Sequence, residues 1–467
     1  MPILSARTAH GAPADAGAPR SDARAWLVVA MLVVFQVIAF SDKAVLGLVA
    51  DRAIAELGIS PLQFGFIGSA FFFLYSVVSF GVGALAGRVS TSSILLVMGL
   101  VWAVVQFPML LGGGAAVLLV TRIVLGGAEG PATAMSLNSA HGWFRPQDRA
   151  LPSTLIAMGS ALGPVLAAPL LVAVIVAWGW RWAFGVLGIV GLVWALAWLA
   201  IGADGPFARR RSDGPAPAAS AAPAEEPTVR DVSGLVPLRA VLLGAAFLSA
   251  TLAGFAEFWV QGFLTTWFPK YLGTVIGLSP QQVGLVTTTP WVFGAVLLVV
   301  LGVLGRRGMR GGASVRGAIA LPFALCLVGS GICFVLAALL GGVPALVLLV
   351  VGAGGALIYP MAPAAMAYVV SPEQRAFVMA ALAGVASVGA IVSPTVVGLL
   401  MEQAGYRSPP KGGSDTAESA ASMATGVHNA FLLAGLLLVV GGVLATAYFR
   451  PDSAARRLQS RYHPGAA

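Results

Sequence analysis

The chain alternates long apolar runs with short polar connections from about residue 25 to residue 449. Each run is about 20 to 30 residues long, enough for a helix to cross a bilayer. Lipid offers the backbone no hydrogen-bond partners, so each run is expected to be a helix. The sequence therefore predicts an all-α membrane protein with twelve transmembrane helices. The predicted spans are residues 25–48, 64–87, 93–111, 115–140, 151–176, 180–202, 238–269, 281–304, 314–340, 344–369, 375–402 and 426–449.

Composition excludes an ordinary soluble domain, because 58% of the residues are hydrophobic and only 10% are charged. The net charge of +9 does not indicate nucleic-acid binding, because the basic residues lie in short connections between apolar runs. If both termini are cytoplasmic, most of the 27 Lys and Arg residues fall on the cytoplasmic side, as topology requires. The abundance of Ala, Gly and Arg favours a bacterial protein, so we expect a multi-pass protein of the bacterial plasma membrane.

A polar, proline-rich segment at residues 203–237 interrupts this pattern and cannot bury a core. It predicts a cytoplasmic linker between two six-helix bundles, residues 25–202 and 238–449. Residues 1–24 are expected to be a disordered cytoplasmic tail, and residues 450–467 a second cytoplasmic tail. A monomer is the default expectation for this architecture.

Four charged residues lie more than one helical turn inside the predicted spans of the first half. Arg122 and Glu129 are seven residues apart, so they share one helical face, and Asp42 and Lys43 are adjacent in the first span. Ionised groups at membrane depth are costly, which makes all four functional candidates. Two structural alternatives remain open: Arg122 and Glu129 as a buried ion pair, and Asp42 with Lys43 near a span end, reaching to the interface.

Other polar residues interrupt apolar spans. Gln261 and Thr265 are candidates to line a cavity, although a threonine in a helix often bonds its own backbone. Glu257 stands one turn before Gln261, which is consistent with a proton site or with a counter-ion to Lys43. Tyr75 is a cavity candidate, with ordinary aromatic packing as the alternative.

Several motifs resemble the anion:cation symporter branch of the major facilitator superfamily. They are Arg122…Glu129-Gly-Pro131, Trp143-Phe-Arg-Pro-Gln-Asp-Arg149, Gly159-Ser-Ala-Leu-Gly-Pro164 and Phe263-Leu-Thr-Thr-Trp-Phe-Pro-Lys-Tyr-Leu272. Members of that branch include bacterial galactonate, hexuronate and phthalate carriers and sialin. The resemblance implies two six-helix bundles that rock about a midplane site.

The resemblance also implies roles for individual residues. Asp42 and Glu129 match carboxylates of proton coupling, Lys43 and Arg122 match substrate-binding cations, and Tyr75 matches a cavity tyrosine. Lys43 replaces the usual arginine, so this position offers a point charge instead of the two-pronged guanidinium that binds a carboxylate in bidentate fashion. Ala386 replaces a frequent asparagine, which favours a less hydroxylated substrate than a sugar acid.

Charged residues at the cytoplasmic helix ends are predicted to gate the transport path. They are Arg88 in the loop after the second span and, as latches between helices, Arg145, Asp148, Arg149, Glu373 and Arg375.

Together these features predict a secondary active transporter that imports a small organic anion with protons by alternating access. An exporter that exchanges protons for a metabolite or drug, and a transporter-like sensor without flux, are the alternatives. No phosphate loop, metal-ligand cluster or nucleophilic triad is recognisable, so we expect neither an enzyme nor a cofactor. The expected coupling ion is H+.

Overall fold

The computed structural model describes residues 22–85, 89–145, 148–207, 234–411 and 413–463. Within these ranges every regular element is a helix, and eleven helical segments are long and apolar enough to cross a membrane. α2 (Pro61–Leu85) is a further apolar helix beside them. The all-α fold class expected from the sequence is confirmed.

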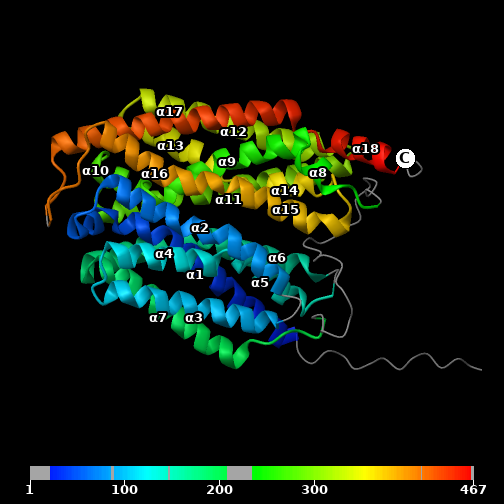
Figure 1. The fold of residues 1–467 in the computed structure, drawn as a ribbon, viewed down its shortest axis with the longest axis horizontal. Coiled ribbons are helices and arrows are strands. Elements are labelled where there is room, and N and C mark those ends of the chain that lie inside the picture. Colours follow the sequence, from blue (N-terminus) through cyan, green and yellow to red (C-terminus); the bar gives the residue numbers. More distant parts are fainter. Residues whose placement is uncertain (1–21, 86–88, 146–147, 208–233, 412, 464–467) are drawn as a thin grey trace, which may run out of the picture.

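The helices form two bundles, one from each half of the chain (Figure 1). The first bundle contains, besides α2, α1 (Asp22–Leu57), α3 (Thr91–Leu110), α4 (Ala115–Glu129), α5 (Ala132–His141), α6 (Ala150–Trp178) and α7 (Trp180–Ile201). The second contains α8 (Leu238–Leu242), α9 (Ala245–Thr266), α10 (Phe268–Thr274), α11 (Pro280–Arg310), the π-helix η2 (Arg316–Ala320), α12 (Leu321–Leu339), α13 (Gly342–Ala356), α14 (Met361–Met366), α15 (Pro372–Ala386), α16 (Val388–Gln403), α17 (Ala417–Tyr448) and α18 (Pro451–Tyr462).

Three predicted spans are interrupted near their middle, among them the span at 375–402, which divides at Ser387 into α15 and α16. The span at 115–140 divides into α4 and α5 around Gly130 and Pro131, because proline has no N–H to continue the ladder. Glu129 is therefore the last residue of α4. The tenth span likewise divides between α13 and α14, on either side of Tyr359 and Pro360.

Small residues let the helices of a bundle touch backbone to backbone. A Cβ built on Gly126 of α4 would lie 1.6 Å from the carbonyl oxygen of Phe71 in α2, so no larger residue fits there. Gly159 of α6 meets the carbonyl of Val33 in α1 in the same way. Close glycine contacts of this kind are typical of membrane helices, where packing rather than the hydrophobic effect drives association.

The two bundles are joined at one end of the molecule. Hydrogen bonds between the bundles lie towards the end opposite to α18, where α10 and the connection after α16 are found (Figure 1). Examples are the Leu62 N–H to the Glu402 carboxylate at 2.9 Å and the Ser408 hydroxyl to the Ile59 carbonyl at 2.7 Å. We call this end the outer end, after the predicted topology.

The connection between the last two predicted spans, 375–402 and 426–449, is shorter than predicted. α17 begins at Ala417, because the Thr416 hydroxyl accepts a hydrogen bond from the Ser419 N–H at 3.1 Å and caps the helix. The apolar pattern of the sequence missed this first part of α17, since it is rich in small and polar residues.

Candidate functional site

The middle of α1 carries the first two charges of the site. Asp42 lies about 30 Å from the start of this helix, at 1.5 Å per residue, and its side chain is buried. Its Oδ1 accepts a hydrogen bond from Gln106 Nε2 of α3 at 2.8 Å. A buried, hydrogen-bonded carboxylate in the middle of a long helix does not reach an interface, so that alternative is wrong for Asp42.

Lys43 lies between aromatic rings. Its Nζ is 3.8 Å from the ring centroid of Phe40 and 4.9 Å from that of Tyr75, so both rings contribute cation–π attraction. Tyr75 is thus placed beside a candidate substrate-binding cation, and its role as a cavity residue stays a prediction.

Arg122 projects from α4 towards α1 and is buried. Its Nη1 donates to the backbone carbonyl of Asp42 at 3.0 Å, and its guanidinium carbon lies 5.2 Å from the ring centroid of Phe184. Nη2 is also buried, but it has no hydrogen-bond partner in the described part of the chain. A charged donor that is buried and not satisfied costs several kcal/mol, which makes Nη2 a group ready to bind an acceptor.

Glu129 has the same property with the opposite charge. Both of its carboxyl oxygens are buried without a hydrogen-bond partner among the described residues, and the carboxylate interacts electrostatically with Asp42, Lys43 and Arg122. No ion pair within 4.0 Å joins Glu129 to Arg122 in the described structure. Seven residues separate the two by about 10 Å along α4, so they share a face without touching. The structural ion pair is therefore not formed.

We call these four residues the central cluster: Asp42, Lys43, Arg122 and Glu129. Next to it is a small cavity of about 10 Å³, room for about one water molecule. Both halves of the chain line this cavity, through Lys43, Leu46, Gly68, Phe71, Phe72, Arg122, Thr265 and Thr266. Lys43 and Arg122 of the cluster therefore face the interface between the two bundles.

The second half contributes hydroxyl groups but no charge to this cavity. Thr265 and Thr266 line it, although the Thr265 hydroxyl donates to the carbonyl of Gln261 at 2.9 Å in its own helix. Gln261 itself does not line the cavity. Its role in substrate binding stays a prediction.

Glu257 is buried in α9 but apart from the central cluster. Its electrostatic neighbour is Tyr359, whose ring packs against Gly254 one turn earlier in α9. In the part of the chain that is described, no ion pair or electrostatic contact links Glu257 to Lys43. The structure does not place it as a counter-ion of Lys43, and its role in proton coupling stays a prediction.

The predicted cytoplasmic latches lie at the other end of the molecule. Arg88 and the side chain of Glu373 are outside the described residues. Arg145 and Asp148 are exposed, Arg149 Nε donates to the Phe144 carbonyl at 3.1 Å, and Arg375 Nε donates to the Ala367 carbonyl at 2.8 Å. Each of these two bonds stays within one bundle, so the gating role of these residues remains a prediction.

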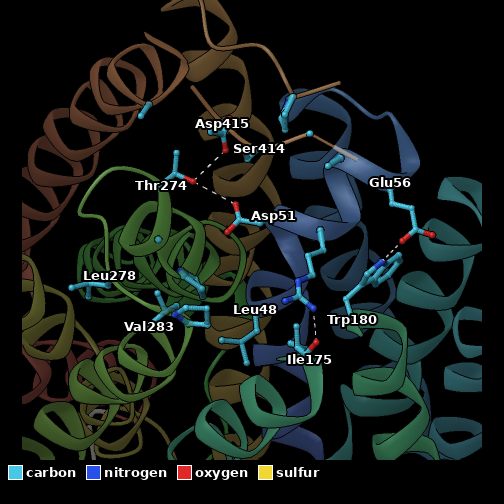
Figure 2. A pocket seen from close by; sticks show the side chains of 18 of the residues that line it. Leu48, Asp51, Glu56, Ile175, Trp180, Thr274, Leu278, Val283, Ser414 and Asp415 are labelled. Atoms are coloured by element: carbon cyan, nitrogen blue, oxygen red, sulfur yellow. Dashed lines mark hydrogen bonds between the residues drawn. The ribbon is translucent and has the colours of Figure 1, made fainter. Parts of the chain in front are cut away.

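Sequence reasoning missed a second charged site at the outer end. Lys270 of α10 is fully buried between the carboxylates of Asp51 in α1 and Asp415 in the connection before α17. Figure 2 shows Thr274 between the same two carboxylates, with hydrogen bonds to both. A cavity of about 900 Å³ lies beside them, lined by residues of both bundles such as Leu48 and Val283.

Comparison with known proteins gives the family. The protein-family model described as Major Facilitator Superfamily matches residues 31–348 and 321–465 of the sequence. The hexuronate transporter of Bacillus subtilis is 30% identical over 275 residues, which are 59% of this chain and 63% of that protein. The D-galactonate transporter of Escherichia coli O6:H1 is 26% identical over 329 residues, which are 66% of this chain and 74% of that protein. A probable sulfoacetate transporter of Cupriavidus necator is 26% identical over 285 residues, 60% and 65% of the two chains.

The match to the hexuronate and sulfoacetate transporters spans slightly less than two thirds of their length. Solved structures show the same fold. A bacterial homolog to the human lysosomal transporter Spinster superposes with a TM-score of 0.75 at 18% identity, covering 94% of this chain and 99% of that chain. A D-xylose-proton symporter gives 0.66 at 12% identity, with 92% and 99% covered. The chain belongs to the major facilitator superfamily, and its relatives are transporters, not enzymes.

Proposed function

We propose that this member of the major facilitator superfamily imports a small organic anion, a carboxylate, together with protons. The observation that carries the proposal is the central cluster, which groups two cations and two carboxylates. Asp42, Arg122 and Glu129 are buried, and Lys43 and Arg122 face the cavity between the bundles. The relatives named as hexuronate, D-galactonate and sulfoacetate transporters support an anionic substrate.

The substrate carboxylate binds between Lys43 and Arg122. Both cations face the small cavity, and Nη2 of Arg122 is the donor that lacks a partner. An incoming carboxylate accepts a hydrogen bond from that donor and compensates the charge of the Arg122 guanidinium, which is shielded from water. Thr265 and Thr266 approach the same cavity from the other bundle, so substrate contacts both halves.

Glu129 binds the transported proton, and Asp42 is the second carboxylate that takes part in proton coupling in the same cluster. Without substrate the two cations balance the two carboxylates. A substrate with one carboxylate adds one negative charge, and protonation of Glu129 restores neutrality. An uncompensated buried charge is costly, so the loaded carrier reorients only with the proton bound. We therefore propose one proton for each monocarboxylate.

Transport proceeds by rocking of the bundles about this site. The outer end is held closed by hydrogen bonds between bundles, and the termini lie on the cytoplasmic face of a bacterial plasma membrane. Each chain contains the whole cluster, so a monomer is sufficient.

Uptake into reconstituted vesicles tests the proposal. Labelled aromatic acids, aldonates and hexuronates are offered with and without an inward proton gradient. We expect gradient-driven accumulation of at least one acid. Accumulation should be strongly reduced in Glu129→Gln and unchanged in the matched control Glu418→Gln, which alters an exposed carboxylate of α17. An acid that raises the melting temperature without flux under any gradient would favour the sensor instead. Efflux driven by an opposed gradient would favour the exporter.

A further inference from the structure

Lys270 has two carboxylate partners that belong to different bundles. Asp51 comes from α1 of the first bundle, whereas Asp415 belongs to the second bundle, as Lys270 does. When the bundles separate at their outer end, the bond to Asp51 must break and the bond to Asp415 need not. We call Asp51, Lys270 and Asp415 the outer latch.

The two carboxylates are held differently. Asp415 Oδ2 lies 2.8 Å from Lys270 Nζ, while its Oδ1 accepts from the Tyr406 hydroxyl at 3.0 Å and the Ser419 hydroxyl at 2.9 Å. All of these partners are in the second bundle. Asp51 is half-exposed, with 53% of its side chain accessible, and it borders the outer cavity. Asp415 is thus fixed in place, whereas Asp51 sits where water can take over its hydrogen bonds.

We propose that Asp51 is the releasing half of the outer latch and that Asp415 is a permanent counter-ion which makes release reversible. Removing one partner of a buried ion pair is strongly destabilising, because the remaining charge is left without compensation. Lys270 avoids that state, since Asp415 stays with it after Asp51 departs. This inference rests on the proposed transport function, which requires the outer end to open in every cycle.

The two carboxylates then have opposite effects on opening. Asp51→Asn removes the ion pair that crosses between bundles and favours the open state. Asp415→Asn leaves Asp51 as the one carboxylate paired with Lys270. Opening would then leave a buried cation without a counter-ion, so the equilibrium shifts towards the closed state. A simple ion-pair cluster without this division would loosen in both variants.

Labelling of a buried cysteine reports the opening. Ser69 of α2 is buried at the bundle interface, where its hydroxyl lies 2.7 Å from that of Thr395 in α16. Ser69→Cys is introduced into the full chain with Cys326 and Cys333 replaced by Ala, and the protein is placed in lipid nanodiscs. The rate of reaction with a charged maleimide then measures how often the outer end opens.

We expect Asp51→Asn to react roughly fivefold faster, as for a pair with one half-exposed partner. Asp415→Asn should react at least roughly tenfold more slowly, because a buried charge loses its compensation on opening. Glu56→Gln is the matched control: Glu56 borders the same cavity but pairs with Arg181 of its own bundle at 3.0 Å, so its rate should equal that of the parent.

Faster reaction in both Asp variants, or no change in either, would overturn the inference. Tyr406→Phe guards against misfolding of Asp415→Asn, since it removes one hydrogen bond from Asp415 and should slow the reaction in the same direction. Labelling needs no substrate, so a failure of the latch is distinguishable from a failure to transport carboxylates.

Discussion

Replacing Glu129 by Gln should separate exchange from net uptake. The substitution keeps the shape of the side chain and removes its charge and its proton. The empty cluster then holds two cations and one carboxylate, whereas the cluster loaded with a monocarboxylate is neutral without a proton. The loaded carrier can still reorient, and the empty carrier cannot.

The magnitude follows from the burial of the cluster. Both Glu129 oxygens and the Arg122 guanidinium are shielded from solvent, so a charge without compensation costs about 3–5 kcal/mol there. At about 1.4 kcal/mol per tenfold change, the return of the empty carrier slows by roughly 100-fold or more. Net uptake should fall by that factor.

The assay compares net uptake with counterflow in the same proteoliposomes, at several pH values. Counterflow needs only the loaded carrier, so it should survive in Glu129→Gln and become independent of pH. Net uptake at the wild-type rate, or loss of counterflow together with net uptake, would refute the charge-balance reasoning. Glu418→Gln again serves as the control for the loss of a carboxylate.

Three further outcomes are expected. Lys43→Gln should raise the KM for the transported carboxylate roughly tenfold to hundredfold, from the loss of a charged partner, and Lys43→Arg should retain most of the affinity; an unchanged KM in Lys43→Gln would exclude contact. Gly126→Ala should lower stability by about 1–3 kcal/mol in thermal unfolding, since its Cβ would collide with the Phe71 carbonyl, whereas Gly302→Ala, which meets nothing within 4 Å, should not. The ratio of the labelling rates of Asp51→Asn and its parent, both carrying Ser69→Cys, should stay constant between about pH 5 and 9, and a step in this ratio would contradict the charges assigned to the outer latch.

The pH expectation follows from the outer latch itself. Burial raises the pKa of Asp415, but Lys270 and the hydrogen bonds outweigh it and hold the pKa below its ordinary 3.8. Burial lowers the pKa of Lys270, but Asp51, Tyr406 and Asp415 raise it above its ordinary 10.5. The contribution of Asp415 to the stability of the outer latch is present above pH 3.8 and fades only below it. The contribution of Lys270 is complete below pH 10.5. Neither group changes charge near neutrality, so pH dependence of transport should come from the central cluster.

The sequence predicted the helices and the central cluster because both leave local signals. Apolar runs of membrane length indicate spans, and a charge inside such a run is conspicuous. Asp42, Lys43, Arg122 and Glu129 were therefore found individually. Their geometry was not, because helical spacing shows which residues share a face and does not show how far apart their charged groups lie across helices.

The outer latch left no such signal. Lys270 stands at the end of a span and Asp415 in a polar connection, where charges are ordinary, and 145 residues separate the two. Their pairing depends on how the connection after α16 folds back over α10, which no local pattern encodes. The break after Glu129 was missed for a related reason, since Gly130 and Pro131 are tolerated inside membrane helices.

Counting protons against substrate tests the central claim most directly. Vesicles that contain the carrier and a trapped pH-sensitive dye are given a labelled monocarboxylate, and both fluxes are recorded together. We predict one proton entering with each substrate molecule in the wild type, and substrate exchange without proton movement in Glu129→Gln. Substrate accumulation in the wild type without any proton flux would contradict the account.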